Sequence, residues 1–358
     1  MHIPDGYLSP STCVTLYAGA AVGWYASLKR LKRVLLSRMV PLISVFAAFA
    51  FVVMMFNLPL PGGTTGHALG VTIAAIVLGP SGAVLAVSIA LAIQALFFGD
   101  GGISTLGANC CNMAIVGSLV AYGTYRLIAA GTAISSKRRV AAAAIAGYLA
   151  LNATALIAAI EFGIQPALFH TANGTPLYAP YPLGIAIPAM MIGHLTFAGL
   201  AEAVISAGLV AHLQVADPGL LRATSGIAAR GDAASPSEQP ATKSLRRLWL
   251  TVVFLMLLTP LGILAAGTAW GEWAPSEFAR GGSVPQPTGP SHGLAVTAGM
   301  QRLSTLWTAP FPSYAPGFVK SPAFGYLLSA MFGVGFLLAA SLLLQHYFKR
   351  RRSTGHSS

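Results

Sequence analysis

The sequence predicts an all-α polytopic membrane protein, and its composition and the spacing of its apolar segments carry that prediction. Of the 358 residues, 55% are hydrophobic and only 8% are charged, and the mean hydropathy is +0.70. Soluble domains carry about 25% charged residues, and disordered chains combine low hydrophobicity with high charge. The composition therefore excludes both a water-soluble globular protein and a disordered chain.

Apolar segments of about membrane-spanning length recur along the whole chain. A helix that crosses a bilayer needs about 20 mostly apolar residues. The third segment is short and ends at the turn signal Gly79-Pro80-Ser81-Gly82. We expect nine spans, near residues 11–28, 39–57, 67–80, 82–98, 108–128, 139–160, 184–213, 247–267 and 322–346.

Basic residues are distributed unevenly between the two sides that these spans define. All but three of the 21 Lys and Arg residues fall on one side, and the exceptions are Arg280, Arg302 and Lys320. Cytoplasmic loops of membrane proteins are enriched in Lys and Arg. We therefore expect an inner (plasma) membrane protein in contact with the lipid bilayer, with its N-terminus outside and its C-terminus in the cytoplasm. The net charge of +12 does not indicate a nucleic-acid partner, because the basic residues form short clusters between apolar runs.

A polar stretch divides the chain into two membrane units. Residues 215–246 are rich in Ala, Ser and Pro and indicate a cytoplasmic linker. We expect a seven-helix domain over residues 1–214 and a two-helix domain over residues 247–358, the latter with a long outer loop. The sequence contains no G-x-x-x-x-G-K-[ST] phosphate-binding motif, so any energy from ATP has to come from a partner.

The first two residues offer nitrogen donors for a metal ion. The chain begins Met1-His2-Ile3-Pro4-Asp5-Gly6, and the bulk of His2 is expected to leave Met1 in place with a free amine. The Met1 amine, the His2 backbone amide and the His2 imidazole lie within chelate-ring reach of one another. Planar nitrogen donation suits Ni²⁺ or Cu²⁺. The alternative is that His2 is only a polar residue near an exposed terminus.

His67 is the candidate for the remaining donor. It follows the Gly-rich segment Pro61-Gly62-Gly63-Thr64-Thr65-Gly66, at the expected outer start of the third helix. The spans place it on the same side of the membrane as Met1. A packing or helix-capping role for this histidine is the alternative.

Four motifs resemble the NikM/CbiM family of substrate-binding (S) components of nickel and cobalt energy-coupling-factor (ECF) transporters. They are Met1-His2-Ile3-Pro4-Asp5-Gly6-Tyr7-Leu8, Gly63-Thr64-Thr65-Gly66-His67, the stretch from Gly99-Asp100-Gly101-Gly102 to Asn109, and Gly193-His194-Leu195 to Ala203. The stretches Thr259-Pro260-Leu261-Gly262 and Ala266-Gly267-Thr268-Ala269-Trp270-Gly271-Glu272-Trp273 resemble a NikN-type partner. The chain therefore looks like a NikMN fusion.

The resemblance implies a site and partners. It implies a square-planar metal site formed by the Met1 amine, the His2 amide and imidazole, and the His67 imidazole. Ni²⁺ or Co²⁺ is then the transported substrate, and no bound organic cofactor is expected. It also implies a transmembrane coupling (T) component and cytoplasmic ATPase subunits as partners, in an ABC-type complex.

Five further polar residues are candidates for supporting roles. Asp100, Ser104 and Asn109 lie in an expected outer loop, level with the N-terminus, where they either hold the metal ligands or cap the helix that begins near Ala108. His194 and Glu202 lie within the seventh span at positions i and i+8. Ionisable side chains inside a membrane are functional candidates, and mutual packing is their alternative role.

Two other functions compete with nickel uptake. Cobalt uptake for cobalamin synthesis would use the same machinery. An intramembrane serine hydrolase would use Ser81 in Gly79-Pro80-Ser81-Gly82 with His194 as its base. The expected topology places Ser81 at a cytoplasmic turn and His194 toward the outside, too far apart for the hydrogen bond that Ser–His catalysis requires.

The topology can be tested with reporters fused after Ser358. We expect a reporter that works only in the cytoplasm to be active there, because the basic residues place that end inside. A silent cytoplasmic reporter, together with an active periplasmic one, would contradict the proposed orientation.

Overall fold

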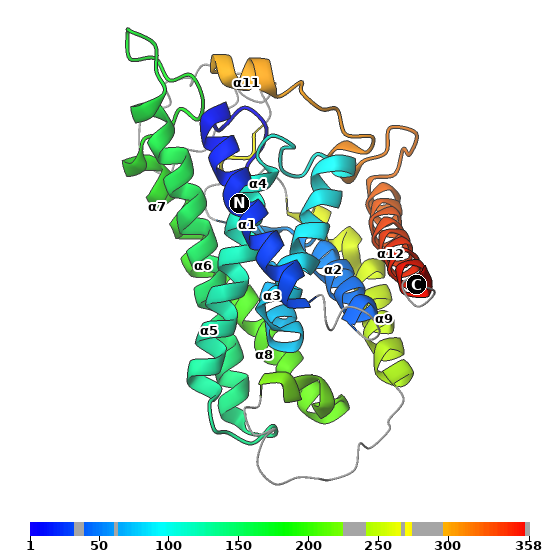
Figure 1. Ribbon diagram of the computed structural model, residues 1–358. Helices are drawn as coiled ribbons and strands as arrows, with labels where there is room; N and C mark the ends of the chain where they lie inside the picture. The colour runs from blue at the N-terminus through cyan, green and yellow to red at the C-terminus, as the bar shows by residue number, and fades with distance from the viewer. Residues whose placement is uncertain (32–38, 61–63, 225–240, 266–268, 274–295, 355–358) are drawn as a thin grey trace.

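The computed structural model describes the chain except for residues 32–38, 61–63, 225–240, 266–268, 274–295 and 355–358. It is almost entirely helical (Figure 1). In chain order the membrane-associated helices are α1 (Pro10–Leu31), α2 (Val40–Met54), α3 (Val71–Ile93), α5 (Gly117–Ala129), α6 (Lys137–Leu168), α7 (Leu183–Gly193), α8 (Gly199–Ala216), α9 (Ala241–Leu258) and α12 (Pro322–Thr354). Shorter elements join them: η2 (Gln94–Phe98), α4 (Leu106–Asn109), η3 (Cys110–Val116), η4 (His194–Ala198), η5 (Pro218–Thr224), η6 (Thr259–Leu264), α11 (Ala298–Leu303) and η7 (Pro312–Tyr314).

The described residues contain six helices that are long and apolar enough to span a membrane, where the sequence predicted nine. Two predicted segments do not qualify, and two others merge into one span. α2 has only 15 residues and qualifies as a shorter apolar helix. α1 has 22 residues, but Ser, Thr, Tyr and Gly alternate with its apolar side chains and lower its hydropathy. The segments predicted near 67–80 and 82–98 form the single span Val71–Phe98.

The expected break between those two segments is present as a kink inside α3. Gly79 has φ 73° and ψ 169°, which an α-helix does not allow, and Pro80 follows it. A positive φ is readily adopted by glycine alone, and a proline at this place removes a backbone donor. The turn signal therefore marks a change of direction within one helical element.

α6 packs against α5, α7 and α8 through small side chains. Ala142, Ala146 and Ala150 on α6 are fully buried. A Cβ at Gly147 would lie 2.8 Å from the Ser206 Oγ atom of α8, so only a glycine lets the two helices approach this closely. Small residues at helix contacts are the usual packing device of membrane helices.

Large apolar side chains remain exposed on the outer faces of the helices. Val14 and Val22 on α1 are each 69% exposed, and Val204 on α8 is 72% exposed. In water such faces would be unfavourable, whereas lipid chains solvate them. This distribution agrees with a multi-pass membrane protein.

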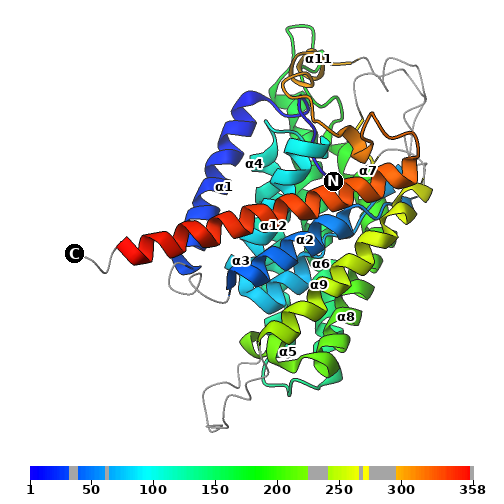
Figure 2. The same ribbon diagram turned by 90° about the vertical axis from the view of Figure 1, so that its right-hand side faces the viewer.

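The C-terminal helices pack against the N-terminal bundle. α9 and α12 contact α2, and α12 crosses obliquely over α2 and α3 (Figure 2). The Tyr326 hydroxyl of α12 donates to the Met55 carbonyl at 2.9 Å, and Gly262 of η6 approaches the same carbonyl. The division into domains 1–214 and 247–358 stays a prediction. Within the predicted linker 215–246, residues 225–240 lie outside the described residues, and η5 and the start of α9 flank them.

One β-hairpin interrupts the helices, which the all-α prediction did not include. β1 (Leu58–Leu60) pairs antiparallel with β2 (Thr64–Gly66), so that Leu58 lies opposite Gly66. The hairpin follows α2 and leads into His67, and α3 begins only at Val71. His67 is therefore a loop residue between β2 and α3. The sequence-based expectation that it starts the third helix is wrong.

Candidate metal site

The first three residues are buried inside the bundle. Met1, His2 and Ile3 are 3%, 1% and 0% exposed, and the N-terminus lies within the outline of the helices in both views (Figures 1 and 2). The Met1 sulfur accepts a hydrogen bond from the Thr154 hydroxyl of α6 at 3.1 Å. The alternative of an exposed terminus is therefore wrong.

The Asn109 side chain makes two hydrogen bonds to the backbone of Ile3. The Asn109 side-chain oxygen accepts from the Ile3 amide at 2.8 Å, and its Nδ2 donates to the Ile3 carbonyl at 3.2 Å. The same carbonyl accepts from the Gly102 amide at 2.9 Å and from the Thr105 hydroxyl. The position of His2, one residue before Ile3, follows from these bonds.

Ser104 supports the N-terminal segment through Asp5. The Ser104 amide donates to Asp5 Oδ1 at 2.7 Å, and its hydroxyl also donates to that oxygen. The Ile103 amide donates to Asp5 Oδ2 at 3.1 Å. The Thr105 position before α4 has no side-chain capping bond, so neither Ser104 nor Asn109 caps the following helix.

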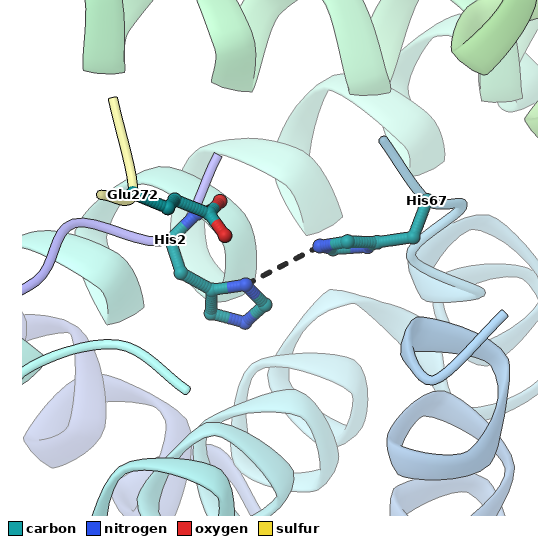
Figure 3. A group of neighbouring side chains, drawn as sticks. All are labelled: His2, His67 and Glu272. Atoms are coloured by element: carbon teal, nitrogen blue, oxygen red, sulfur yellow. Dashed lines mark hydrogen bonds between the residues drawn. The ribbon is translucent and has the colours of Figure 1, made fainter. Parts of the chain in front are cut away.

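The two predicted histidines meet inside the bundle. His2 Nδ1 and His67 Nε2 lie 3.3 Å apart, and their ring centroids are separated by 5.0 Å (Figure 3). His67 Nδ1 lies 3.1 Å from the Ala68 carbonyl and donates its proton there. That bond leaves the His67 Nε2 lone pair directed at His2, which is the arrangement of metal-binding histidines.

Glu272 completes the cluster and was not among the predicted site residues. Its Oε1 atom accepts from the Met1 amine and, at 2.8 Å, from the His2 backbone amide. One ligand atom each from His2, His67 and Glu272 lies within 4.8 Å of the others (Figure 3). The available signal was an acidic residue between Trp270 and Trp273 in an otherwise apolar segment. Its meeting with His2, 270 positions away, is a tertiary contact.

Asp100 lies on the other side of His2, as the sequence suggested. Its Oδ1 atom is 3.1 Å from His2 Nδ1, and its Oδ2 accepts from the Tyr314 hydroxyl at 2.6 Å and from the Gln94 amide at 3.3 Å. Sequence reasoning missed both Gln94 and Tyr314. The three predicted supporting residues Asp100, Ser104 and Asn109 are thus all placed around residues 1–5.

Burial controls protonation in this site. It lowers the pKa of His2 and that of His67 to about 4, so both rings are neutral at physiological pH. Burial, reinforced by Glu272, raises the pKa of Asp100 to about 6. Burial also acts to raise the pKa of Glu272, but the Met1 amine and the histidines outweigh it and hold that pKa below its ordinary value.

His194 and Glu202 are both buried but bond to different partners. His194 Nδ1 donates to the Met190 carbonyl at 2.7 Å. Glu202 Oε2 accepts from the Leu69 and Gly70 amides at 2.8 and 3.1 Å. Glu202 therefore anchors the turn that follows His67. His194 and Glu202 therefore do not pair with each other, because the Glu202 carboxylate accepts from these two backbone amides.

A cavity of about 590 Å³ adjoins the cluster, and His67, Asp100, Glu272, Tyr314 and Trp307 are among its lining residues. It is mixed in polarity, with carboxylates beside aromatic rings. Of the clustered side chains, His67, Glu272 and Asp100 border this cavity. By contrast, Ser81 lies beside the α3 kink, and within the described residues it makes no hydrogen bond with His194.

A family model described as "CbiM: Cobalt uptake substrate-specific transmembrane region" matches residues 2–220. The chain belongs to this family. It is a family of membrane transport components and not of enzymes, so the hydrolase alternative fails. The match ends at residue 220 and leaves the segment that carries Glu272 and Tyr314 outside.

Full-length relatives cover that segment as well. The chain is 52% identical over 344 residues to the fused nickel transport protein NikMN of Rhodobacter capsulatus, with 95% of each chain covered. It is 39% identical over 354 residues to the probable fused nickel transport protein LarMN of Lactiplantibacillus plantarum, covering 97% of this chain and 98% of the relative. A crystal structure of a truncated transition metal transporter is 52% identical, with a TM-score of 0.55, and covers 60% of this chain and 98% of its own.

Replacing Asn109 with Ala should loosen the N-terminal segment. The change leaves the Ile3 amide without its side-chain acceptor. An unpaired buried donor costs about 1–3 kcal/mol, which would raise the equilibrium constant for local opening about 5- to 150-fold. Hydrogen–deuterium exchange of the peptide covering residues 2–8 measures this opening. Asn173→Ala, in an exposed loop, is the matched control. Equal exchange in both variants would contradict the role of Asn109.

Proposed function

We propose that this protein binds Ni²⁺ from outside the membrane and delivers it for ATP-driven import. The observation that carries the proposal is the convergence of the Met1 amine, the His2 backbone amide, and the His2 and His67 ring nitrogens in one buried site. Co²⁺ is the second candidate substrate, because the matching family is described by cobalt uptake.

The donor chemistry favours nickel. The four nitrogen atoms suit a planar site, a geometry that Ni²⁺ accepts readily. Bonds of about 2.0 Å would place neighbouring nitrogens about 2.8 Å apart. His2 Nδ1 and His67 Nε2 already lie 3.3 Å apart, so a small movement of either ring brings them to that spacing. The names of the NikMN and LarMN relatives, both nickel transport proteins, support the same metal.

Transport requires partners, because the sequence contains no nucleotide-binding motif. Family membership implies a transport complex, and we propose a transmembrane T component and cytoplasmic ATPase subunits as its other members. The cavity beside His67 and Glu272 would face the outside, in agreement with the topology expected from the basic residues.

Glu272 comes from the predicted C-terminal domain, residues 247–358, and contacts the proposed metal ligands. Its Oε1 atom contacts the two backbone nitrogens that the metal would take, so ion and carboxylate cannot occupy that position together. The carboxylate would move aside as the ion enters, and its charge would remain next to a divalent cation. In the metal-free state it holds the donors in place.

Adding one Ala before Met1 should abolish nickel binding as fully as His2→Ala or His67→Ala. The insertion converts the amine into an amide and displaces the chelating atoms, although every side chain remains. We expect a loss of affinity of at least 10- to 100-fold, the range known for lesser disturbances of metal sites. Calorimetric titration of the purified protein with Ni²⁺ measures it.

A change of equal length at the other end provides the control. One Ala added after Ser358 should leave the affinity unchanged, because the sequence there is polar and that end is expected in the cytoplasm. A protein extended before Met1 that binds Ni²⁺ as tightly as the native chain would contradict the chelate. In that case, a site made of His67, Glu272 and Asp100 side chains alone would be favoured.

Replacing Glu272 with Gln should weaken Ni²⁺ binding by about 10-fold or more, because a negative charge beside the cation is lost while the shape is kept. Asp217→Asn, which removes a carboxylate next to η5, is the matched control and should bind normally. Competition against a chelating dye measures both affinities. Unchanged affinity of Glu272→Gln would show that the carboxylate has no part in binding.

A further inference from the structure

Two buried polar atoms beside the metal site have no hydrogen-bond partner. They are His2 Nε2 and the Gln94 side-chain oxygen Oε1, and they are unpaired within the part of the chain that the structure describes. Both residues are almost fully buried, at 1% and 0% exposure. Leaving a buried polar group unpaired is costly, so a state in which a proton lies between the two atoms would be favoured.

The orientation of the Gln94 amide is fixed by its nitrogen. Nε2 donates to the Tyr314 hydroxyl at 3.0 Å and to Asp100 Oδ2 at 3.3 Å. The Tyr314 hydroxyl in turn donates to Asp100 Oδ2 at 2.6 Å, so it accepts from Gln94. Flipping the amide would place its oxygen against the Asp100 oxygen. Oε1 therefore stays on the other side of the amide, where it has no partner among the described residues.

The Asp100 carboxylate joins the His2 ring to the Gln94 side chain. Both side chains contact the Asp100 carboxylate, His2 through Nδ1 at 3.1 Å and Gln94 through Nε2. In the metal-free state Nδ1 lies beside two acceptors, Asp100 Oδ1 and His67 Nε2, so the ring proton resides on Nδ1 and Nε2 is left bare and, within the described ranges, unpaired.

Metal binding at Nδ1 reverses this arrangement. The ring is neutral and keeps one proton. Once Nδ1 gives its lone pair to the metal, that proton has to reside on Nε2. Metal-bound histidines almost always donate the other ring N–H to a fixed acceptor. In the part of the chain that the structure describes, the Gln94 oxygen is an unpaired buried acceptor on a residue that shares Asp100 with His2.

We propose that Gln94 is the positioning residue of His2: its Oε1 accepts the Nε2 proton of the metal-bound ring and thereby selects Nδ1 as the ligating atom. This inference rests on the proposed function. The His2 amide nitrogen and Nδ1 are connected through Cα, Cβ and Cγ, so that both can bind one metal ion in a six-membered chelate ring. Nδ1 is therefore the ring nitrogen suited to chelate together with the amide. Gln94 would make that tautomer the stable one in the loaded state only.

The C-terminal unit takes part in this support through Tyr314. Ser313 and Tyr314 have φ values of 53° and 59°, a left-handed conformation that residues other than glycine adopt at a cost. The strained turn brings the Tyr314 hydroxyl to Asp100 and Gln94. The orientation of Gln94 therefore depends on a residue beyond the segment that the family model matches.

The first test compares Gln94→Met with Gln214→Met. Methionine preserves length and burial but removes the acceptor, and Gln214 makes its bonds to the Ile134 and Ser136 carbonyls, away from the cluster. We expect Gln94→Met to lower Ni²⁺ affinity by about 10- to 100-fold, while Gln214→Met binds as the native protein does. An affinity of Gln94→Met within about twofold of native would overturn the proposal.

The second test needs no variant and follows the proton itself. Square-planar Ni²⁺ is diamagnetic, so the full-length protein labelled with ¹⁵N-histidine allows the ring protons to be observed by NMR after Ni²⁺ is added. We expect one new, slowly exchanging, hydrogen-bonded Nε2 proton, which loses its downfield shift in Gln94→Met and keeps it in Gln214→Met. A loaded His2 ring that carries its proton on Nδ1 would overturn the proposal, even if Gln94→Met fails to fold. Absence of Ni²⁺ binding by the native protein would instead contradict the proposed function.

Discussion

Burial of residues 1–3 inside a helical bundle is the constraint on which the rest of the structure depends. A chain terminus carries an amine and unpaired backbone groups, and placing them among apolar helices is costly unless each finds a partner. Here Glu272 accepts from the Met1 amine and the His2 amide, and Asn109 satisfies the Ile3 amide. The loop from Gly99 to Asn109 is folded around this segment, with the Gly102 amide on the Ile3 carbonyl. Nitrogen donors that would be mobile on a surface are thereby held in one place.

The turn around His67 is also held by specific hydrogen bonds. His67 lies between the β-hairpin and α3, where its own backbone has no regular pairing. Glu202, from the middle of the long α7–α8 span, accepts from the Leu69 and Gly70 amides and fixes that turn. A buried carboxylate that accepts backbone hydrogen bonds is satisfied without a cation. Glu202 thus connects the transmembrane helix to the position of His67, although it does not reach the cluster itself.

The C-terminal unit is part of the site and does not merely lie beside the bundle. It contributes Glu272 to the candidate metal cluster, and its Tyr314 contacts Asp100 and Gln94. The related crystal structure that covers 60% of this chain is a truncated protein, and the matching family model ends at residue 220. The cluster in this chain therefore combines residues from inside the matched region, His2 and His67, with Glu272 from outside it. α2 is the contact surface that α9 and α12 share with the N-terminal helices.

The sequence by itself determined the membrane class, most of the helical segments, and the pair His2 and His67, because hydropathy and local motifs are short-range signals. It also indicated the Gly79 break, although α3 continues through the kink as one element. Only the tertiary structure decided which polar residues meet. Glu272 and Tyr314 lie more than 200 positions from their partners, and Gln94 lies within an apolar run where nothing local marks it. Glu202 likewise accepts from a backbone turn and does not pair with His194. The packing of the helices decides which hydrogen-bond partners meet. Spacing along one helix does not reveal the atoms that another segment brings against it.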